Sequence, residues 1–359
     1  MTDNLNIGFL SPHNPFDRTA FSGTAFHVHR ALAAQPAVQV RVLGNHAPVT
    51  RLARLWTRLR GRRPFVLGPV EPAGLDRIVA LTATGLADDL LAQSCPVPIA
   101  HVTDATPAFL REFYGHEIPA EADAREARVV RGAAWTVYSS DYMARRAVTE
   151  FGVESRRVRV VPFGTNIDPL PEALPEKPPL DVLRLLWVGS GWERKGGVLA
   201  LETFAALRAQ GRPARLTLVG DVPTDLALPE GVERVGYLDK NDPAAEDRLN
   251  RLFAEAHLFM LPTRADCTPM VVAEANAWGT PVLITDTGGI ASLMASEGGN
   301  GRMLAPEAGP EDWAGAIRAL AADPAAYAAL CRTSFDHARA RLTWEAWARD
   351  LVACLRGRA

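Results

Sequence analysis

The chain has 359 residues, of which 48% are hydrophobic and 22% are charged, and its formal net charge is −2. This composition is typical of soluble globular proteins and excludes a disordered chain, a collagen-like chain and a disulfide-stapled miniprotein. The length accommodates about two or three domains. No run of about 18 apolar residues occurs and the N-terminus lacks a signal-peptide pattern, so we expect a cytoplasmic protein.

Cysteine and lysine are both scarce in this chain. The four cysteines are widely scattered and lack the spacing of a zinc site, so we expect buried thiols and no metal. Among the 39 basic residues, the lysines are Lys177, Lys195 and Lys240. In a chain that uses arginine so heavily, each remaining lysine is a candidate for a specific role.

Short apolar runs alternate with amphipathic stretches over the first 168 residues. The pattern predicts strands at residues 6–10, 38–43, 77–81, 99–102, 135–139 and 158–162, with helices at residues 24–34 and 141–151. Strands that alternate with helices indicate βαβ units and a parallel, doubly wound sheet. We therefore expect a Rossmann-like domain over residues 1–168.

A basic stretch interrupts this domain at residues 51–63, which contain six arginines. Its apolar residues recur at the spacing of one helix face, so the stretch predicts a basic amphipathic helix of the kind found at anionic membrane surfaces. An ordinary surface helix that packs its apolar stripe on the sheet is the alternative. The stretch matches no known nucleic-acid-binding module, so we expect no nucleic-acid partner.

Five prolines within residues 169–179 exclude a helix or a central strand and predict a semi-rigid linker over residues 169–180. The alternation then resumes. Strands are predicted at residues 183–188, 215–219, 257–261 and 281–285, and helices at residues 198–210, 270–278 and 344–355, within a helical region that starts at residue 310.

The predicted fold class is therefore α/β. We expect two Rossmann-like, doubly wound domains that face each other across a cleft, the second spanning residues 181–340. Ligands of open α/β sheets bind at the carboxyl ends of the strands, so the loops at those ends are the candidate sites.

A glycine-rich loop follows the predicted strand at residues 183–188 and precedes a helix. Its glycines, Gly191 among them, let backbone N–H groups approach a ligand, and a helix N-terminus carries about half a positive charge. Arg194 and Lys195 add two full charges, so the loop suits a diphosphate. The alternative is a solvated turn in which the two basic residues have no role.

A second candidate segment runs from Asp266 to Glu274. Thr268 is a predicted N-cap and Pro269 a predicted first residue of the following helix. Glu274 falls on the apolar face of that helix, where an unpaired charge is costly. It therefore needs a partner, which is either a sugar diol such as a ribose or a buried arginine.

Two adjacent glycines, Gly288 and Gly289, follow the predicted strand at residues 281–285. Such a turn can offer backbone N–H groups to an anion or to sugar hydroxyls, although a plain turn is the alternative.

These segments together resemble the family 4 glycosyltransferases, which retain anomeric configuration and have the two-domain GT-B fold. The resemblance covers essentially the whole chain. Its most specific part is the Asp266-x7-Glu274 pattern with the following Ala-x-Gly-x-Pro-Val. Further matching segments are Lys195-Gly196, Gly288-Gly289-Ile290, Ser140-Asp141, residues 160–168 and Ser22-Gly23-Thr24.

The resemblance implies roles for individual residues. Lys195 and Arg194 would neutralise the leaving nucleoside diphosphate, Glu274 would hold the ribose hydroxyls, and Asp266 would face the donor sugar. Further donor contacts would come from Gly23, Gly191, Tyr237, Leu238, Cys267, Thr268, Pro269, Met270, Gly288 and Gly289. Two residues of the first domain, His101 and Asp104, are candidates for contact with the donor sugar or the acceptor.

This sequence departs from the family pattern at two positions. Asp266 stands where the family has glutamate, and Ser190 stands where many members have arginine, a charge that Arg194 would then supply. The implied reaction is front-face transfer, in which the leaving phosphate helps to deprotonate the acceptor. That chemistry needs no metal, no cofactor and no dedicated nucleophile.

The expected function is a retaining glycosyltransferase that uses a nucleotide-sugar donor, UDP- or GDP-linked, and a glycan, lipid-linked or other hydroxyl acceptor bound by the first domain. We expect residues 341–359 to pack back on the first domain, and the basic stretch 51–63 to bring the protein to the inner face of a membrane. The alternatives are a non-catalytic nucleotide-sugar-binding or scaffold protein, and a nucleotide-sugar epimerase.

Overall fold

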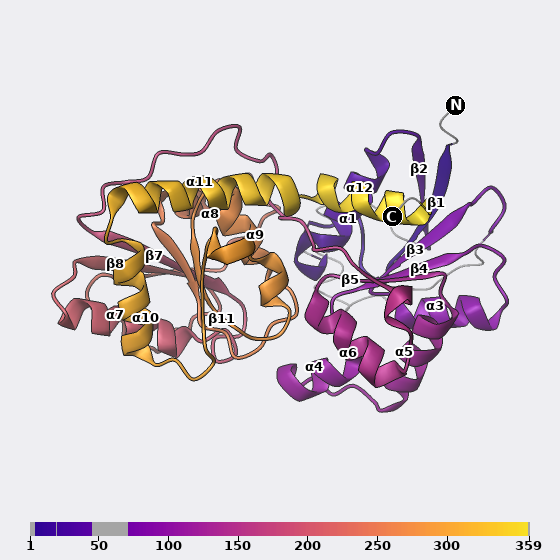
Figure 1. Cartoon of the computed structure of the whole chain (residues 1–359), viewed down its shortest axis with the longest axis horizontal. Helices are drawn as coiled ribbons and strands as arrows, with labels where there is room; N and C mark the ends of the chain where they lie inside the picture. Colours follow the sequence, from indigo (N-terminus) through magenta and orange to yellow (C-terminus); the bar gives the residue numbers. More distant parts are fainter. Residues whose placement is uncertain (1–3, 19, 45–70, 358–359) are drawn as a thin grey trace. The chain divides into compact units, whose positions relative to one another are not determined.

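The computed structural model describes residues 4–18, 20–44 and 71–357 (Figure 1). It divides into two compact units. Unit 1 comprises Met1–Pro162 and Trp344–Ala359, and unit 2 comprises Phe163–Thr343. The basic helix predicted at residues 51–63 lies outside the described residues. Every helix within the described ranges is too short or too polar to span a membrane.

Unit 1 is built on a parallel sheet with the strand order β2-β1-β3-β4-β5-β6 in the described part of the chain. The strands are β1 (Leu5–Leu10), β2 (Val38–Leu43), β3 (Arg77–Leu81), β4 (Ile99–Thr103), β5 (Trp135–Tyr138) and β6 (Val158–Val160). The central strands β3 and β4 are almost wholly buried, as their continuous apolar runs require in a sheet covered on both faces.

The helical segments of unit 1 in the described part of the chain are η1 (Ala20–Gly23), α1 (Thr24–Ala33), α3 (Thr84–Ala92), α4 (Pro107–Tyr114), α5 (Glu121–Gly132), α6 (Asp141–Phe151), η2 (Ser155–Arg157) and α12 (Trp344–Leu355). The sequence pattern predicted α1, α6 and α12, but not α3, α4 and α5. The C-terminal helix α12 packs against α1, and the Arg356 side chain donates to the carbonyl of Ala37 at 3.1 Å. The chain therefore returns to unit 1 at its end.

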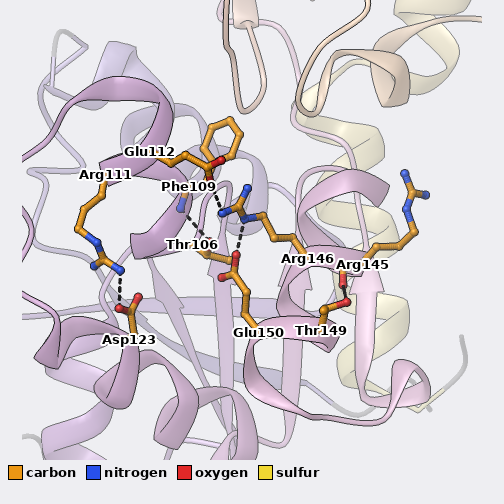
Figure 2. Close-up of polar contacts among 9 residues, drawn as sticks. All are labelled: Thr106, Phe109, Arg111, Glu112, Asp123, Arg145, Arg146, Thr149 and Glu150. Atoms are coloured by element: carbon orange, nitrogen blue, oxygen red, sulfur yellow. Dashed lines mark hydrogen bonds and ion pairs between the residues drawn. The ribbon is translucent and has the colours of Figure 1, made fainter.

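Helices α4 and α6 are joined by Arg146 (Figure 2). Its guanidinium donates to Glu112 of α4 at 2.6 Å, pairs with Glu150 one turn further along α6, and lies 5.5 Å from the ring centre of Phe109. Thr106 starts α4 by accepting a hydrogen bond from the Phe109 N–H at 3.3 Å. Arg146 thus fixes the two helices that follow β4 and β5.

Unit 2 contains a second parallel sheet, with the strand order β12-β11-β10-β7-β8-β9 in the described part of the chain. The strands are β7 (Leu183–Gly189), β8 (Ala214–Gly220), β9 (Val232–Gly236), β10 (Leu258–Leu261), β11 (Val282–Thr285) and β12 (Gly301–Leu304). The two parallel sheets confirm the predicted α/β, doubly wound fold class.

Helices cover both faces of the unit 2 sheet (Figure 1). Trp187 of β7 packs with α7 (Gly197–Ala209) and α10 (Pro310–Leu320), whereas its neighbour Leu186 packs with α8 (Pro243–Glu255) and α9 (Met270–Ala277). This alternation follows from the two-residue period of a strand. The remaining helical segments are α11 (Pro324–Arg341), which packs on α9, η3 (Ile290–Leu293) and η4 (Ser296–Gly298).

The proline-rich segment lies within unit 2, which spans Phe163–Thr343. The Lys177 ammonium reaches the carbonyl oxygens of Phe253, Ala254 and Trp278 at 2.9–3.3 Å and the Thr280 hydroxyl at 2.6 Å. These carbonyls end α8 and follow α9, so a lysine from the predicted linker caps two helices of unit 2.

Candidate functional site

The central strands β7 and β10 are the topological switch point of the unit 2 sheet. The chain leaves β7 for α7 on one face and leaves β10 for α9 on the other face. In open α/β sheets a crevice forms where the connections diverge in this way, outside the carboxyl ends of the strands. The two loops at this point carry Arg194, Lys195 and Asp266, so the structure brings these three predicted residues together.

The loop between β7 and α7 has a conformation that requires glycine. Gly191 and Gly196 have φ values of +79° and +71°, and a Cβ on Gly196 would lie 1.8 Å from the carbonyl oxygen of Pro262. A Cβ on Gly197 would lie 2.1 Å from the Trp192 ring. The loop is therefore pressed against the chain that follows β10, and Gly196 is the N-cap of α7.

Two cations converge on one carboxylate at this point. The Lys195 ammonium pairs with the Asp266 carboxylate, and Arg194 Nη1 lies 3.6 Å from the same oxygen. The Lys195 and Asp266 side chains are 10% and 6% exposed. Arg194 also donates to the Ala265 carbonyl at 2.9 Å. Because the N-terminus of α7 adds its partial positive charge, the cluster retains an excess of positive charge that suits an anion.

The glycine pair after β11 supports the Asp266 loop. The Gly289 N–H donates to the Asp266 carbonyl at 3.0 Å, so this donor is engaged within the protein. Gly288 has a φ of +56°, and a Cβ there would lie 2.0 Å from the same carbonyl oxygen. The two glycines thus permit the close approach of β11's loop to the loop that follows β10.

The helix after Asp266 begins at Met270, as the predicted range 270–278 requires, but not at the capping residues that the sequence indicates. Pro269 is extended, with a ψ of 99°, and α9 starts at Met270. The predictions of Thr268 as N-cap and Pro269 as first helical residue are therefore wrong. Cys267 and Thr268 are buried, and Met270 is half-buried. Tertiary packing of this loop between the strand ends overrides the local capping preference.

Glu274 lies in the middle of α9 and is 2% exposed. Its Oε1 accepts a hydrogen bond from Lys240 at 2.5 Å. The partner is therefore a lysine, not the arginine weighed as an alternative, and the pairing is compatible with further hydrogen bonds because a carboxylate has about four acceptor sites. Lys240 is the main site residue that motif matching misses. The scarcity of lysine is the one signal in the sequence that points to it.

Lys240 follows the segment predicted to meet a nucleobase. Tyr237 is 70% exposed, whereas Leu238 packs against the core cluster that includes α8 and α9. The loop is therefore anchored by a leucine and presents an aromatic ring to solvent. An exposed tyrosine is a common element of binding surfaces.

The predicted residues of unit 1 have different environments. Gly23 has a φ of +86° and begins α1, and a Cβ there would lie 2.7 Å from the Arg18 carbonyl. Asp104 directly follows β4 and is half-buried. His101, in contrast, has no exposed surface, and its Nε2 lies 2.8 Å from Glu126.

Glu126 is the centre of a buried polar group in unit 1 that the sequence did not reveal. It accepts from the Thr84 hydroxyl at 2.6 Å and lies beside His101 and Tyr138. Burial raises the pKa of this carboxyl, but the charge and hydrogen bond of His101 and the two hydroxyls outweigh burial and hold the pKa below its usual value. The group joins β4 to α5 in the interior of the unit.

Part of unit 2, including the candidate site, matches a known protein family. Residues 183–323 match the family model described as "Glycosyl transferases group 1". Two relatives are named D-inositol 3-phosphate glycosyltransferase. The one from Pseudarthrobacter chlorophenolicus is 26% identical over 67% of this chain and 61% of its own length, and the one from Gordonia bronchialis is 28% identical over 69% and 58%. The chain thus spans about three fifths of these relatives.

Solved structures with the same fold cover nearly the whole chain. The Anabaena protein Alr3699/HepE in complex with UDP has a TM-score of 0.70 at 15% identity, over 98% of this chain and all of its own. Sucrose-phosphate synthase from Thermosynechococcus elongatus has a TM-score of 0.66 at 18% identity, over 99% of both chains. At such identities the likeness establishes the GT-B fold.

Proposed function

We propose that this chain transfers a sugar from a nucleotide-sugar donor to a hydroxyl acceptor, with retention of anomeric configuration, because residues 183–323 match the family model of the glycosyl transferases group 1. The main support is the cluster of Lys195, Arg194 and Asp266 at the switch point of unit 2. Two cations and the N-terminus of α7 meet there, and a departing nucleoside diphosphate requires such positive charge.

Each part of the unit 2 site has a role in this proposal. Arg194 and Lys195 bind the diphosphate, and the glycine at position 191 lets the loop approach it. Glu274 accepts hydrogen bonds from the ribose hydroxyls. Asp266 faces the donor sugar together with the backbone of residues 267–270 and the turn at residues 288–289.

The donor in this proposal is a UDP- or GDP-sugar whose base lies beside Tyr237 and Leu238. Support comes from the Anabaena protein of the same fold, whose structures contain UDP and UDP-glucose. A loop that presents an exposed ring above an apolar anchor offers a flat surface to a base. The ribose would then fall near Glu274, because Lys240 of the same loop reaches that carboxylate.

The transfer step needs charge stabilisation more than it needs a nucleophile. The bond between the anomeric carbon and the diphosphate oxygen breaks, the acceptor oxygen bonds to that carbon on the same face, and the acceptor proton passes to the departing phosphate. Negative charge grows on the diphosphate, where Arg194 and Lys195 already lie. Two fixed cations serve where other transferases use a metal ion, so we propose a metal-independent reaction without a cofactor.

Unit 1 would bind the acceptor, a glycan or lipid-linked molecule with a free hydroxyl. Gly23 and Asp104, which follow β1 and β4, are the candidate contacts there. If the predicted basic helix at residues 51–63 forms, its arginines would hold the protein at an anionic membrane surface, at about 1 kcal/mol for each basic residue.

The experiment that tests this proposal compares nucleotide binding and turnover in the wild type and Lys195→Ala. Calorimetric titration with UDP, GDP, ADP and dTDP identifies the base, and release of the diphosphate from the matching sugar donors, with and without glycan acceptors, measures transfer. We expect Lys195→Ala to weaken diphosphate binding and to lower the rate by about 10²–10³. Arg215→Ala, which removes an exposed charge from β8, is the control and should match the wild type.

Three outcomes would contradict the proposal. Failure of the wild type to bind any of the four nucleotides would remove the diphosphate site. Binding without turnover on any acceptor would favour a non-catalytic binding protein. Conversion of the donor sugar in the absence of an acceptor would favour an epimerase.

A further inference from the structure

The ion pair between Lys240 and Glu274 joins two elements that the proposed donor site uses separately. Glu274 belongs to α9, and Lys240 belongs to the loop between β9 and α8. Their atoms are 2.5 Å apart, and the side chains of Glu274 and Lys240 are 2% and 20% exposed respectively. A carboxylate so deeply buried is costly unless it is paired and hydrogen-bonded, so the lysine is needed to keep it charged in place.

The loop that carries Lys240 is itself held in one conformation. The Asp239 carboxylate accepts from the backbone N–H of Asn241 at 2.8 Å, and the Asp239 carbonyl accepts from the N–H of Asp242 at 2.8 Å. Asp242 then caps α8 by accepting from the Ala244 N–H at 3.1 Å. These bonds fix the backbone on both sides of Lys240 and so direct its side chain toward α9.

The pair leaves Glu274 able to bind a ligand. Only Oε1 takes part in the bond to Lys240, and within the described residues no other hydrogen bond to this carboxylate is present. The other oxygen, Oε2, has no hydrogen-bond partner among the residues that the structure describes, and it is not fully buried, so it keeps some accessible surface. The lysine therefore orients the carboxylate while leaving an oxygen for two hydroxyl donors.

We propose that Lys240 is a positioning residue for the ribose of the donor. Through its bond to Oε1, Lys240 holds the Glu274 carboxylate ionised and turned so that its open oxygen accepts from the ribose 2′- and 3′-hydroxyls. It also ties the loop of Tyr237 to α9, so base recognition and ribose recognition form one unit. This inference rests on the proposed function, because it assumes that the ligand is a nucleoside diphosphate.

The test is the preference of the protein for a ribonucleotide over its 2′-deoxy analogue. UDP, GDP and ADP are titrated alongside 2′-deoxy-UDP, 2′-deoxy-GDP and 2′-deoxy-ADP into the wild type, Lys240→Met, Lys240→Arg and Glu274→Gln. A hydrogen bond to a charged group gives the wild type a preference of about ten- to a hundredfold for the ribonucleotide that binds. We expect Lys240→Met and Glu274→Gln to reduce it to about threefold or less, and Lys240→Arg to retain most of it.

A matched control separates this role from general support of the loop. Arg248 of α8 pairs with Glu233 of β9 at 3.2 Å on the surface. This pair therefore links the two elements that flank the loop of Lys240. Arg248→Ala should keep the wild-type preference. Where Lys240→Met does not give a folded protein by circular dichroism, Lys240→Gln, which keeps a donor without the charge, takes its place with the same expectation.

The outcomes distinguish this inference from the function on which it rests. Equal weakening of both nucleotides in Lys240→Met would assign the lysine a purely structural role and overturn the inference. Tighter binding of UDP in that variant would mean that Lys240 competes with the ribose, which also overturns it. A wild type that binds nucleoside diphosphates without preferring the ribose would refute the inference alone, whereas a wild type that binds none would refute the proposed function as well.

Discussion

The three lysines of this chain each hold a defined set of oxygen atoms. Lys195 pairs with Asp266 and Lys240 with Glu274, so each carboxylate of the predicted motif has its own lysine. Lys177 lies within hydrogen-bond distance of four oxygens. An ammonium is compact and has three rotatable donors, whereas a guanidinium is a rigid fork, so arginine does not replace lysine easily at such points.

Residue types indicated which residues are candidates for the site, but not how their atoms pair. The sequence indicates Lys195, Asp266 and Glu274 by their positions after predicted strands and on a helix face. Their pairings join residues 71 and 34 positions apart, which no local period reports. Lys240 was visible only as a rare residue type, because its partner is set by how the loop after β9 folds onto α9.

Asp266 is the carboxylate partner of both cations of the site, and this predicts a separation of binding from catalysis. In Asp266→Asn, Lys195 loses a buried partner, so we expect the free energy of unfolding to fall by about 3–5 kcal/mol. The freed cations should bind UDP more tightly than in the wild type, whereas transfer should slow because the charge that we propose to face the donor sugar is gone. Urea unfolding, calorimetric titration and steady-state rates measure the three effects.

The exposed pair between Asp247 and Arg251 provides the control for that variant. Asp247→Asn should change stability by less than about 1 kcal/mol and leave UDP binding as in the wild type, since a surface pair is worth little. Weaker UDP binding in Asp266→Asn would contradict the argument, because it would mean that the carboxylate assists the diphosphate instead of competing with it.

At the scale of elements, apolar runs located the central strands well, but helix starts needed tertiary information. Three helices begin at pairs that the sequence displays, Thr106-Pro107, Asp242-Pro243 and Asp323-Pro324, where the first residue caps and proline follows. The same rule fails at Thr268-Pro269, because packing of that loop holds Pro269 extended. The edge strands β9 and β12 also escaped prediction, since their residues are only partly buried and show no continuous apolar run.

The turn into α7 predicts a strong dependence of stability on Gly196. Alanine there must adopt a φ of +71°, which costs about 1–2 kcal/mol, and its Cβ must be accommodated against the Pro262 carbonyl, which costs about 1–3 kcal/mol more. We expect Gly196→Ala to lower the free energy of unfolding by the sum of these terms and to weaken diphosphate binding, as followed by urea unfolding and titration.

Gly211 separates the two contributions. It has a φ of +75° at the end of α7, but a Cβ there would meet no atom within 4 Å. Gly211→Ala should therefore show the backbone cost alone and leave binding intact. Equal losses in the two variants would mean that the close approach of the loop to Pro262 has no energetic consequence.

At the scale of the whole molecule, the alternation of strands and helices predicted two parallel sheets, whereas composition did not predict the contacts of the proline-rich segment. Its prolines predicted a segment without helix or strand, and residues 169–180 contain neither. In the structure the segment packs within unit 2, where Ile167 and Leu170 lie against Ala277 and Ala338 and where Lys177 caps two helices. Composition reports what a segment cannot form, whereas its anchoring depends on partners far away in the chain.

This anchoring predicts that Lys177 controls the local opening of residues 169–180. In Lys177→Met the segment loses its buried hydrogen bonds, so we expect faster amide exchange there, with protection of β7 and β10 little changed. Arg339, which donates to the Pro171 carbonyl at 2.7 Å from an exposed position, is the matched control. Arg339→Ala should change exchange in the segment much less, because a surface tie competes with water.

The protonation of Lys177 provides an independent readout of the same anchor. Burial lowers its pKa to about 8 from 10.5, and nearby Cys331 offsets only part of this effect. Between these values the folded chain has lost a proton that the unfolded chain keeps, so the unfolded state binds more protons. The contribution of Lys177 to the free energy of unfolding therefore rises with pH across this window, by at most about 1.4 kcal/mol for each pH unit. Urea unfolding at about pH 7.5 and pH 9.5 should show this rise in the wild type relative to Lys177→Met, whereas a constant difference between the two proteins would mean that the lysine keeps its proton inside the fold.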